Sequence, residues 1–256
     1  MHISPELLEK MVNLRDAGIY SCGQGCTLKS GMLYRGGEPE PASRRDTELL
    51  LGLGLSSIID LRPGKERKKC PPALAHIHRL QIEVDITGKT MSRLKPYLNR
   101  KGKESEIRGA VASVYADMAE WFRPHWPALF SHLSQEENWP VLIHCRAGKD
   151  RTGVTVALLQ KLCGVSDEDV MSDYLMTNDY LMPRAIRMFR RINLLAFGLL
   201  PLKNYGVAYA AHPIYLDAFF RKIKESFSDP ENYLLKSGVR EDQLQSVRAI
   251  LKGKPG

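Results

Sequence analysis

The chain of 256 residues carries 37 lysine and arginine side chains against 29 acidic ones, which gives a formal net charge of +8, and 43% of its residues are hydrophobic. This composition is typical of a globular protein and excludes a peptide or a disordered tail. An excess of positive charge has three common causes, namely nucleic acid, an anionic membrane surface or small phosphorylated ligands, and the position of the charge distinguishes them.

The N-terminus, the apolar stretches and the cysteines bear on where the protein resides. The first ten residues are polar and acidic, unlike an export signal, so a cytoplasmic protein is expected, with non-classical secretion left open. The longest apolar stretch, 192–202, contains Asn193 and Pro201 and is shorter than the roughly 20 residues of a membrane-spanning helix. An odd number of cysteines in a chain of this size favours reduced thiols. They are Cys22, Cys26, Cys70, Cys145 and Cys163.

The chain shows no internal repeat and no linker, which predicts one domain over residues 1–256. In chain order, the patterns predict a helix over 44–53, strands over 56–62 and 76–84, a helix over 107–122, a short helix that ends at Leu133, a strand over 139–143, and helices over 154–163 and 167–180. The strand over 139–143 is apolar throughout, as expected inside a parallel sheet. Strands that alternate with helices predict an α/β fold with a central, mostly parallel sheet flanked by helices.

The loop after the strand 139–143 carries residues suited to phosphate chemistry. It reads His144-Cys145-Arg146-Ala147-Gly148-Lys149-Asp150-Arg151-Thr152-Gly153. The carboxyl end of a parallel strand followed by a helix N-terminus is where α/β proteins bind anions, because free backbone N–H groups and the helix dipole point there. Such a setting favours the thiolate of Cys145, and the guanidinium of Arg151 can bind two oxygens of a phosphate. A nucleophilic cysteine beside a phosphate-binding arginine predicts phosphoryl transfer.

The pattern His144-Cys145, five residues, Arg151-Thr152 resembles the signature of the protein tyrosine phosphatase superfamily, and the whole loop resembles that of the atypical bacterial tyrosine and lipid phosphatases. Other segments are also similar to that group, namely 13–16, 33–35, 59–62 with 66–67, 173–178, 215–216 and 244–251. The resemblance implies a tyrosine-phosphatase-like α/β fold with a helical lid or insertion. It also implies hydrolysis through a cysteinyl-phosphate intermediate, with no metal and no cofactor.

The resemblance implies a role for each residue of the loop. Cys145 is expected to be the nucleophile, Arg151 to bind the phosphoryl oxygens, and His144 to orient the cysteine. Thr152 is expected either to stabilise the sulfur as a leaving group or to cap the following helix. The other loop residues expected to bind substrate are Arg146, Ala147, Gly148, Lys149 and Gly153.

The general acid, which protonates the leaving oxygen, is not identified by a motif. Relatives usually supply it from an aspartate on a mobile loop after an earlier strand, so Asp85, at the end of the predicted strand 76–84, is the first candidate. Asp150, inside the loop, is the alternative.

Two other charged residues are expected to have structural roles. Asp60 stands two residues before Arg62 and is expected to form an ion pair with it, and Arg15 is expected to pin the N-terminal segment to the core.

The net positive charge is concentrated in two segments. Residues 86–108 carry seven lysines or arginines against two glutamates, and residues 183–205 carry five against no acid, so each has a net charge of +5. The first is interpreted as a basic insertion that attracts polyanionic substrates, or as a solvated face. The second alternates arginines with apolar residues, as in helices that lie on anionic membranes. The resemblance instead places a helical lid over 183–215; lid, core helix and peripheral membrane contact all remain open.

The substrate class is predicted less sharply than the reaction. Lys149 is interpreted either as a cation for a second phosphate, as in phosphoinositide phosphatases, or as a solvent-facing lysine. Phosphotyrosine proteins and phosphoinositides are therefore both expected substrates, and an enzyme acting mainly on inositides or inositol polyphosphates is the alternative. A phosphate-binding module without turnover is the alternative from another class. Nucleic-acid binding fits the charge but no motif, and the oligomeric state is not predicted.

Overall fold

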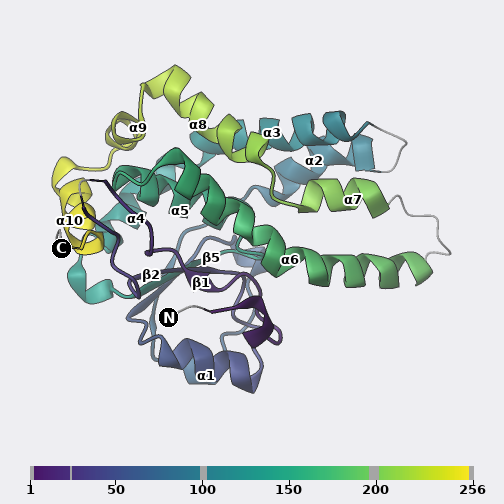
Figure 1. Cartoon of the computed structure of the whole chain (residues 1–256), viewed down its shortest axis with the longest axis horizontal. Coiled ribbons are helices and arrows are strands. Elements are labelled where there is room, and N and C mark those ends of the chain that lie inside the picture. Colours follow the sequence, from purple (N-terminus) through teal and green to yellow (C-terminus); the bar gives the residue numbers. More distant parts are fainter. Residues whose placement is uncertain (1–2, 24, 99–102, 196–201, 254–256) are drawn as a thin grey trace.

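The computed structural model describes residues 3–23, 25–98, 103–195 and 202–253. These residues form five strands and ten α-helices (Figure 1). The strands are β1 (Arg15–Asp16), β2 (Leu33–Gly36), β3 (Ser57–Asp60), β4 (His78–Gln81) and β5 (Val141–His144). The helices are α1 (Arg44–Gly52), α2 (Thr87–Leu98), α3 (Glu104–Trp121), α4 (Trp126–Leu133), α5 (Asp150–Leu162), α6 (Asp167–Leu195), α7 (Leu202–Tyr209), α8 (Pro213–Phe227), α9 (Pro230–Lys236) and α10 (Glu241–Leu251).

The strands form one sheet in the order β1-β2-β5-β3-β4. β1 pairs antiparallel with β2, and the other neighbouring strands are parallel. The prediction of a central, mostly parallel sheet flanked by helices is therefore confirmed. β5 is the central strand and is buried at every residue, as its apolar sequence predicts. Because β2, β3 and β5 run in the same direction, their carboxyl ends meet at one edge of the sheet, where the predicted catalytic loop begins.

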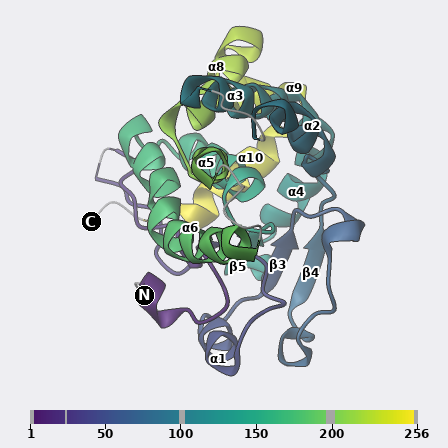
Figure 2. The same cartoon turned by 90° about the vertical axis from the view of Figure 1, so that its right-hand side faces the viewer.

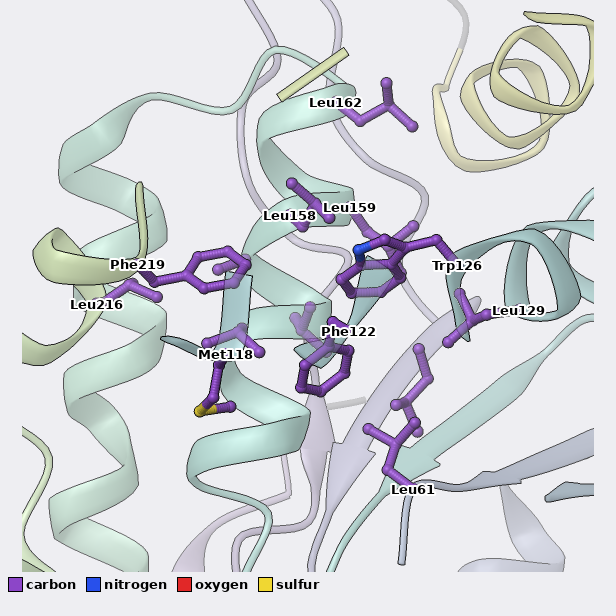
Figure 3. Close-up of a cluster of buried hydrophobic side chains, with 14 of the residues drawn as sticks. Leu61, Met118, Phe122, Trp126, Leu129, Leu158, Leu159, Leu162, Leu216 and Phe219 are labelled. Carbon is purple, nitrogen blue, oxygen red and sulfur yellow. The ribbon is translucent and has the colours of Figure 1, made fainter. Parts of the chain in front are cut away.

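Two apolar clusters cover the two faces of the sheet. Successive residues of a strand point to opposite faces, so Val141 and Ile143 of β5 belong to the larger cluster and Leu142 to the smaller one. The larger cluster packs α3, α4, α5 and α8 against the sheet; Figure 3 shows its centre, where the rings of Phe122 and Trp126 stack at 4.9 Å. α1 and the N-terminal segment lie on the other face of the sheet (Figure 2). The smaller cluster packs them against that face.

Two of the wrongly predicted boundaries concern the site. The helix predicted to begin at residue 154 begins at Asp150, so Arg151 lies in its first turn. An aspartate in the first turn suits the positive end of the helix dipole. The strand predicted over 76–84 is paired only over His78–Gln81, and the chain beyond it turns toward the site.

The helix predicted to end near residue 180 continues to Leu195 as α6, through Pro183. Tertiary contacts hold it together beyond the proline, because Ala185 is buried and Arg184 donates hydrogen bonds to backbone oxygens of Leu8 and Met11. α7 then lies beside the C-terminal part of α6 (Figure 1). Residues 196–201 of the predicted lid, and Arg100 and Lys101 of the basic insertion, lie outside the described residues. Within the described residues, no helix combines the length and apolar character needed to cross a membrane.

The expectation of five reduced thiols is wrong for two of them, because Cys22 and Cys26 form a disulfide. They are four positions apart in sequence, and their Cα atoms lie 5.2 Å apart, within the usual range for a disulfide. Cys70, Cys145 and Cys163 are free. The disulfide closes a short turn near the N-terminus and leaves Cys145 available.

Candidate active site

The loop after β5 borders a cavity of about 550 Å³. Five residues expected in the site line it, namely Cys145, Arg146, Ala147, Asp150 and Arg151. The other loop residues expected in the site are buried beside it; they are His144, Gly148, Lys149, Thr152 and Gly153. Much of the remaining lining is apolar and comes from Met91, Leu94 and Leu98 of α2, Met188 and Phe189 of α6, and Tyr205, Ala208 and Tyr209 of α7. The segment interpreted as a lid, core helix or membrane contact therefore forms part of the cavity wall.

Hydrogen bonds from other parts of the chain hold the backbone of the loop. Asn13 Nδ2 donates to the carbonyl oxygens of Ala147 at 3.2 Å and Gly148 at 2.8 Å. Arg35 Nη2 donates to the carbonyl oxygen of Gly148 at 2.9 Å. The N–H group of a trans peptide points away from its carbonyl, so the N–H groups of Gly148 and Lys149 point away from Asn13 and Arg35. Backbone N–H groups turned in this way are available to the oxygens of a phosphate.

Gly148 is needed because the loop passes very close to β2. Its φ is +68°, and a Cβ placed on it would lie 2.5 Å from the carbonyl carbon of Gly36. Another residue would therefore clash with β2 and would also adopt a left-handed conformation that side chains disfavour.

The side chains that support the loop form a buried ion cluster. Asp173 of α6 accepts hydrogen bonds from Arg15 Nε at 3.1 Å and from Arg35 Nη1, and all three side chains are buried. Burial alone would raise the pKa of Asp173, but the charges of Arg15 and Arg35 outweigh it and hold that pKa below its ordinary value. One carboxylate thus connects α6 and the first two strands to the loop. The expectation that Arg15 pins the N-terminal segment to the core is confirmed.

Replacement of Asp173 by asparagine is expected to lower the free energy of unfolding by about 3–5 kcal/mol, because two buried guanidinium groups would lose their anion. Asp179→Asn is a matched control on the same helix. Asp179 is exposed, so its replacement is expected to change stability by less than about 0.5 kcal/mol. Chemical denaturation of both variants measures the difference, and equal stabilities would show that the cluster does not stabilise the fold.

Glu66 orients the guanidinium of Arg151. Arg151 Nη2 donates to Glu66 Oε2 at 2.7 Å, and Nη1 donates to two backbone carbonyl oxygens at 3.3 and 3.4 Å. Glu66 also accepts a hydrogen bond from Thr87 Oγ1. Burial opposes the charge of Arg151, but the charges of Cys145 and Glu66 outweigh it and raise the pKa of Arg151 above its ordinary value. The cation is therefore held at the cavity in one orientation, as bidentate binding of a phosphate requires.

His144 and Thr152 are both fully buried. His144 Nδ1 lies 3.2 Å from the carbonyl oxygen of Cys145, and Nε2 lies 3.9 Å from Asp60 Oδ2. Burial lowers the pKa of His144 although Asp60 opposes this, so the ring is neutral at neutral pH. Thr152 lies inside α5 and does not cap it, and its Oγ1 makes no hydrogen bond within the described ranges. Asp60 pairs with Arg62 at 2.8 Å, as expected.

Asp150, the alternative candidate for the general acid, lines the cavity together with Cys145. Its Oδ1 accepts a hydrogen bond from Tyr115 Oη at 2.6 Å and lies 3.3 Å from Lys149 Nζ. Tyr115 Oη is itself 2.8 Å from Tyr174 Oη. Across the described part of the chain, no hydrogen bond uses Asp150 Oδ2. One carboxylate oxygen is therefore anchored, and the other is available to carry a proton.

Asp85, the first candidate, does not line this cavity. It borders a separate hollow with Lys89 and Trp121, and its half-exposed side chain lies 2.5 Å from Lys65 Nζ. The hydrogen bond from Lys65 lowers the pKa of Asp85, with a smaller contribution from the charge of Arg151. A lowered pKa disfavours the protonated form that a general acid needs.

Lys149 does not face solvent, because its side chain is 7% exposed. Its Nζ donates to the carbonyl oxygens of Ala208 at 3.1 Å and Tyr209 at 2.9 Å, at the C-terminal end of α7. A cation is favourable there because the last carbonyl groups of a helix lack partners within the helix. Lys149 therefore joins the loop to α7. Arg146, by contrast, is exposed and lines the cavity.

Several residues that support the loop have no role assigned from the sequence, among them Arg35, Glu66 and Tyr115. Arg35 and Glu66 fall in segments similar to the phosphatase family, and this similarity is the only sequence signal that marks them. Tyr115 lies in an amphipathic helix, where a tyrosine is usually a core residue, so no pattern distinguishes it. Each acts through a partner far along the chain.

The profile of the tyrosine phosphatase family matches residues 7–253. A predicted tyrosine-protein phosphatase of Cupriavidus necator is 30% identical over 249 residues, which cover 94% of this chain and 84% of the relative. The triple specificity protein phosphatase PtpB of Mycobacterium tuberculosis is 23% identical over 257 residues, which cover 88% of this chain and 92% of that protein. The solved core catalytic domain of the PP-IP phosphatase Siw14 of S. cerevisiae is 17% identical to this chain, and the match covers 91% of this chain and 97% of that domain, with a TM-score of 0.34. Because the family match spans nearly the whole chain, this protein belongs to the tyrosine phosphatase family and is a phosphoric monoester hydrolase.

Proposed function

We propose that this phosphatase acts through a cysteinyl-phosphate intermediate on Cys145, and that its preferred substrates carry the phosphate on an aromatic ring, as in phosphotyrosine. One observation supports the proposal most directly: a single cavity brings together Cys145, Arg151 and Asp150 and is otherwise largely apolar. The three side chains suit the nucleophile, the phosphate-binding cation and the proton donor of a phosphomonoesterase.

In the proposed mechanism, the thiolate of Cys145 attacks the phosphorus atom, and the bond between phosphorus and the leaving oxygen breaks. Asp150 gives its proton to that oxygen. Arg151 and the backbone N–H groups of the loop bind the three remaining oxygens and stabilise their charge. Water then attacks the cysteinyl phosphate, gives a proton to Asp150, and releases phosphate and the thiolate. These steps need no metal, because side chains supply the nucleophile, the proton and the positive charge.

The cavity lining supports an aromatic substrate. Met188 and Phe189 of α6 and Tyr209 of α7 supply apolar and aromatic surface on which a tyrosine ring can pack. An inositol ring presents hydroxyl groups and further phosphates, which need polar partners. Of the two other loop cations, Lys149 is already bonded to α7, so a second phosphate would have to displace those bonds. The catalytic loop also resembles that of the bacterial lipid phosphatases, so activity on phosphoinositides is expected as a second, slower reaction.

Initial rates on a phosphotyrosine peptide, a phosphoserine peptide and a soluble short-chain phosphoinositide test this proposal. With excess chelator present, kcat/KM is expected to be highest for the phosphotyrosine peptide, by about tenfold or more. A higher rate on the inositide would overturn the preference. A protein that binds phosphotyrosine peptide but turns over none of the three would be a phosphate-binding module, which would overturn the proposed reaction.

The variant Lys149→Ala tests whether Lys149 binds a second phosphate of an inositide or only holds α7. Because Lys149 holds the end of α7, its removal is expected to lower kcat/KM on the phosphotyrosine peptide and on the inositide by similar factors. A loss confined to the inositide would mean that Lys149 leaves α7 to bind a second phosphate, and would favour an inositide phosphatase. Lys161→Ala is a matched control, since this lysine lies on α5 but outside the cavity and pairs with Asp167.

A further inference from the structure

The last ten residues of α6 are the most exposed apolar part of the described chain. Ten large hydrophobic side chains are exposed among the described residues, and five of them lie here. They are Ile186, Met188, Ile192, Leu194 and Leu195, and the last two are 79% and 74% exposed. No residue of α6 beyond Ala185 is fully buried. An apolar surface gathered in one place in this way marks a contact with another apolar body.

The helical spacing sorts these side chains into rows. Met188, Ile192 and Leu195 are separated by four and three residues, so they form one row along α6, which we call the apolar row. Arg187 and Arg191 precede the first two members by one residue each and form a second row beside it, the arginine row. An apolar row bordered by cations is the pattern of a helix that lies in a membrane interface.

The charge of this segment identifies the kind of partner. Residues 183–195 contain four arginines and no acidic residue. Arg184 is bonded to backbone oxygens of the N-terminal segment, whereas no hydrogen bond or ion pair within the described ranges involves Arg187, Arg190 or Arg191. A second copy of this chain would bring the same positive charge to the contact and be repelled. The partner must therefore present both apolar groups and negative charges to α6, as an anionic lipid bilayer does.

The apolar row is continuous with the active-site cavity. Met188 belongs to the row and also lines the cavity, and Met91 of α2 is likewise exposed and lines it. From Met188 the row runs toward the end of α6 that projects past the sheet (Figure 1). A helix that lay on a bilayer along this row would therefore hold one side of the cavity close to the lipid surface.

We propose that the C-terminal part of α6 docks this phosphatase on lipid bilayers that contain anionic phospholipids. Ile192, Leu194 and Leu195 enter the region between headgroups and acyl chains, while Arg187 and Arg191 bind lipid phosphates. The proposal concerns where the enzyme acts, and it holds for whichever phosphomonoester the cavity hydrolyses.

Co-sedimentation with vesicles tests the docking. The wild-type chain is expected to bind vesicles of phosphatidylcholine mixed with phosphatidylserine, to bind pure phosphatidylcholine much less, and to lose affinity as salt is added. The double variant R187Q/R191Q is expected to lower the affinity for the mixed vesicles by about 25-fold, since each cation near such a surface contributes about fivefold. The double variant I192S/L195S is expected to lower it by about tenfold or more.

Matched controls carry the same changes on other helices. R44Q/R221Q removes two exposed arginines from α1 and α8, and L51S/L235S removes two exposed leucines from α1 and α9. Both pairs are expected to leave the affinity for vesicles within about twofold of the wild-type value. All four double variants are expected to hydrolyse p-nitrophenyl phosphate at the wild-type rate, because none of the changed residues lines the cavity.

Three results would overturn the proposal. The first is a failure of the wild-type chain to bind mixed vesicles, and the second is binding by R187Q/R191Q and I192S/L195S that equals that of the wild-type chain. The third is a dimer in sedimentation velocity that I192S/L195S dissociates, which would assign the apolar row to a second copy. Vesicle binding that depends on both rows, in a chain without phosphatase turnover, would support the docking and contradict the proposed reaction; turnover without vesicle binding would do the opposite.

Discussion

Replacement of Cys145 by serine is expected to reduce hydrolysis of p-nitrophenyl phosphate by about a thousandfold or more. Serine changes one atom, so the cavity and the contacts of Arg151 should remain, but a hydroxyl in this place is not ionised at neutral pH as a thiol can be. Steady-state rates with excess chelator measure the loss. The initial burst of p-nitrophenol, which reports the cysteinyl phosphate, should disappear with it.

The two other free cysteines are controls for this change. Burial raises the pKa of Cys163 to about 12, so its thiol is unreactive, and Cys70 lies outside the cavity. C70S and C163S are therefore expected to keep kcat within about twofold of the wild-type value. C145S is also expected to keep its affinity for a phosphotyrosine peptide, because Arg151 and the loop backbone still bind the phosphate. Unchanged turnover in C145S, or turnover that requires added Mg²⁺, would contradict the proposed mechanism.

Replacement of Asp150 by asparagine is expected to lower kcat/KM for phenyl phosphate by about 10²- to 10³-fold, and kcat/KM for p-nitrophenyl phosphate much less. The physical reason is the leaving group: phenolate needs a proton to depart, whereas the nitro group stabilises the departing p-nitrophenolate. The ratio of the two rates therefore reports whether the proton donor has been lost. A general defect of folding or binding would lower both rates alike.

Two further variants test whether the effect of D150N comes from the loss of the proton donor itself. Y115F removes the hydrogen bond to Asp150 Oδ1 but keeps the carboxylate, so it is expected to change the ratio of the two rates by less than about threefold. D85N is expected to leave the ratio unchanged. A selective loss on phenyl phosphate in D85N, with a normal ratio in D150N, would assign the general acid to Asp85 and would require that side chain to leave Lys65 and enter the cavity.

The chemistry of the loop could be predicted because its signals are local. A buried apolar strand, a cysteine at its end and an arginine six residues later all fall within residues 139–153. The structure places Cys145 and Arg151 in one cavity, in agreement with this prediction. The predicted start of the following helix is four residues too late, because backbone that turns tightly around an anion site resembles a loop in its sequence even where it is already helical.

The contacts of the two aspartates could not be predicted from position in the chain. Asp85 ends a predicted strand, as the acid of related enzymes does, but its contact with Lys65 and its place outside the cavity depend on how two loops pack. Likewise, Lys149 carries a signal for a second phosphate, yet its contact with α7 arises from residues about sixty positions away. A motif specifies which groups are present and not which of them are already bonded.

The basic segment 183–205 likewise has features that the sequence shows and features that only the structure shows. Its arginines and apolar residues are evident in the sequence and suggest a lid, a core helix or a membrane contact. The structure makes Met188, Phe189 and Tyr205 part of the cavity wall and leaves Leu194 and Leu195 exposed. Pro183 suggests a break that does not occur, because packing of Ala185 and the bonds of Arg184 hold α6 continuous.

The sequence by itself determined the reaction class of this protein, the mostly parallel sheet and the cysteine that we propose as the nucleophile, because the signals for these lie in neighbouring residues and in short-range periodicity. Only the tertiary structure decided what supports and covers the site. The bonds from Asn13 to Gly148, from Arg151 to Glu66 and from Arg35 to Asp173 join residues 135, 85 and 138 positions apart. Such pairings follow from the packing of the sheet and helices, because burial in a common core brings together charges that no local pattern connects.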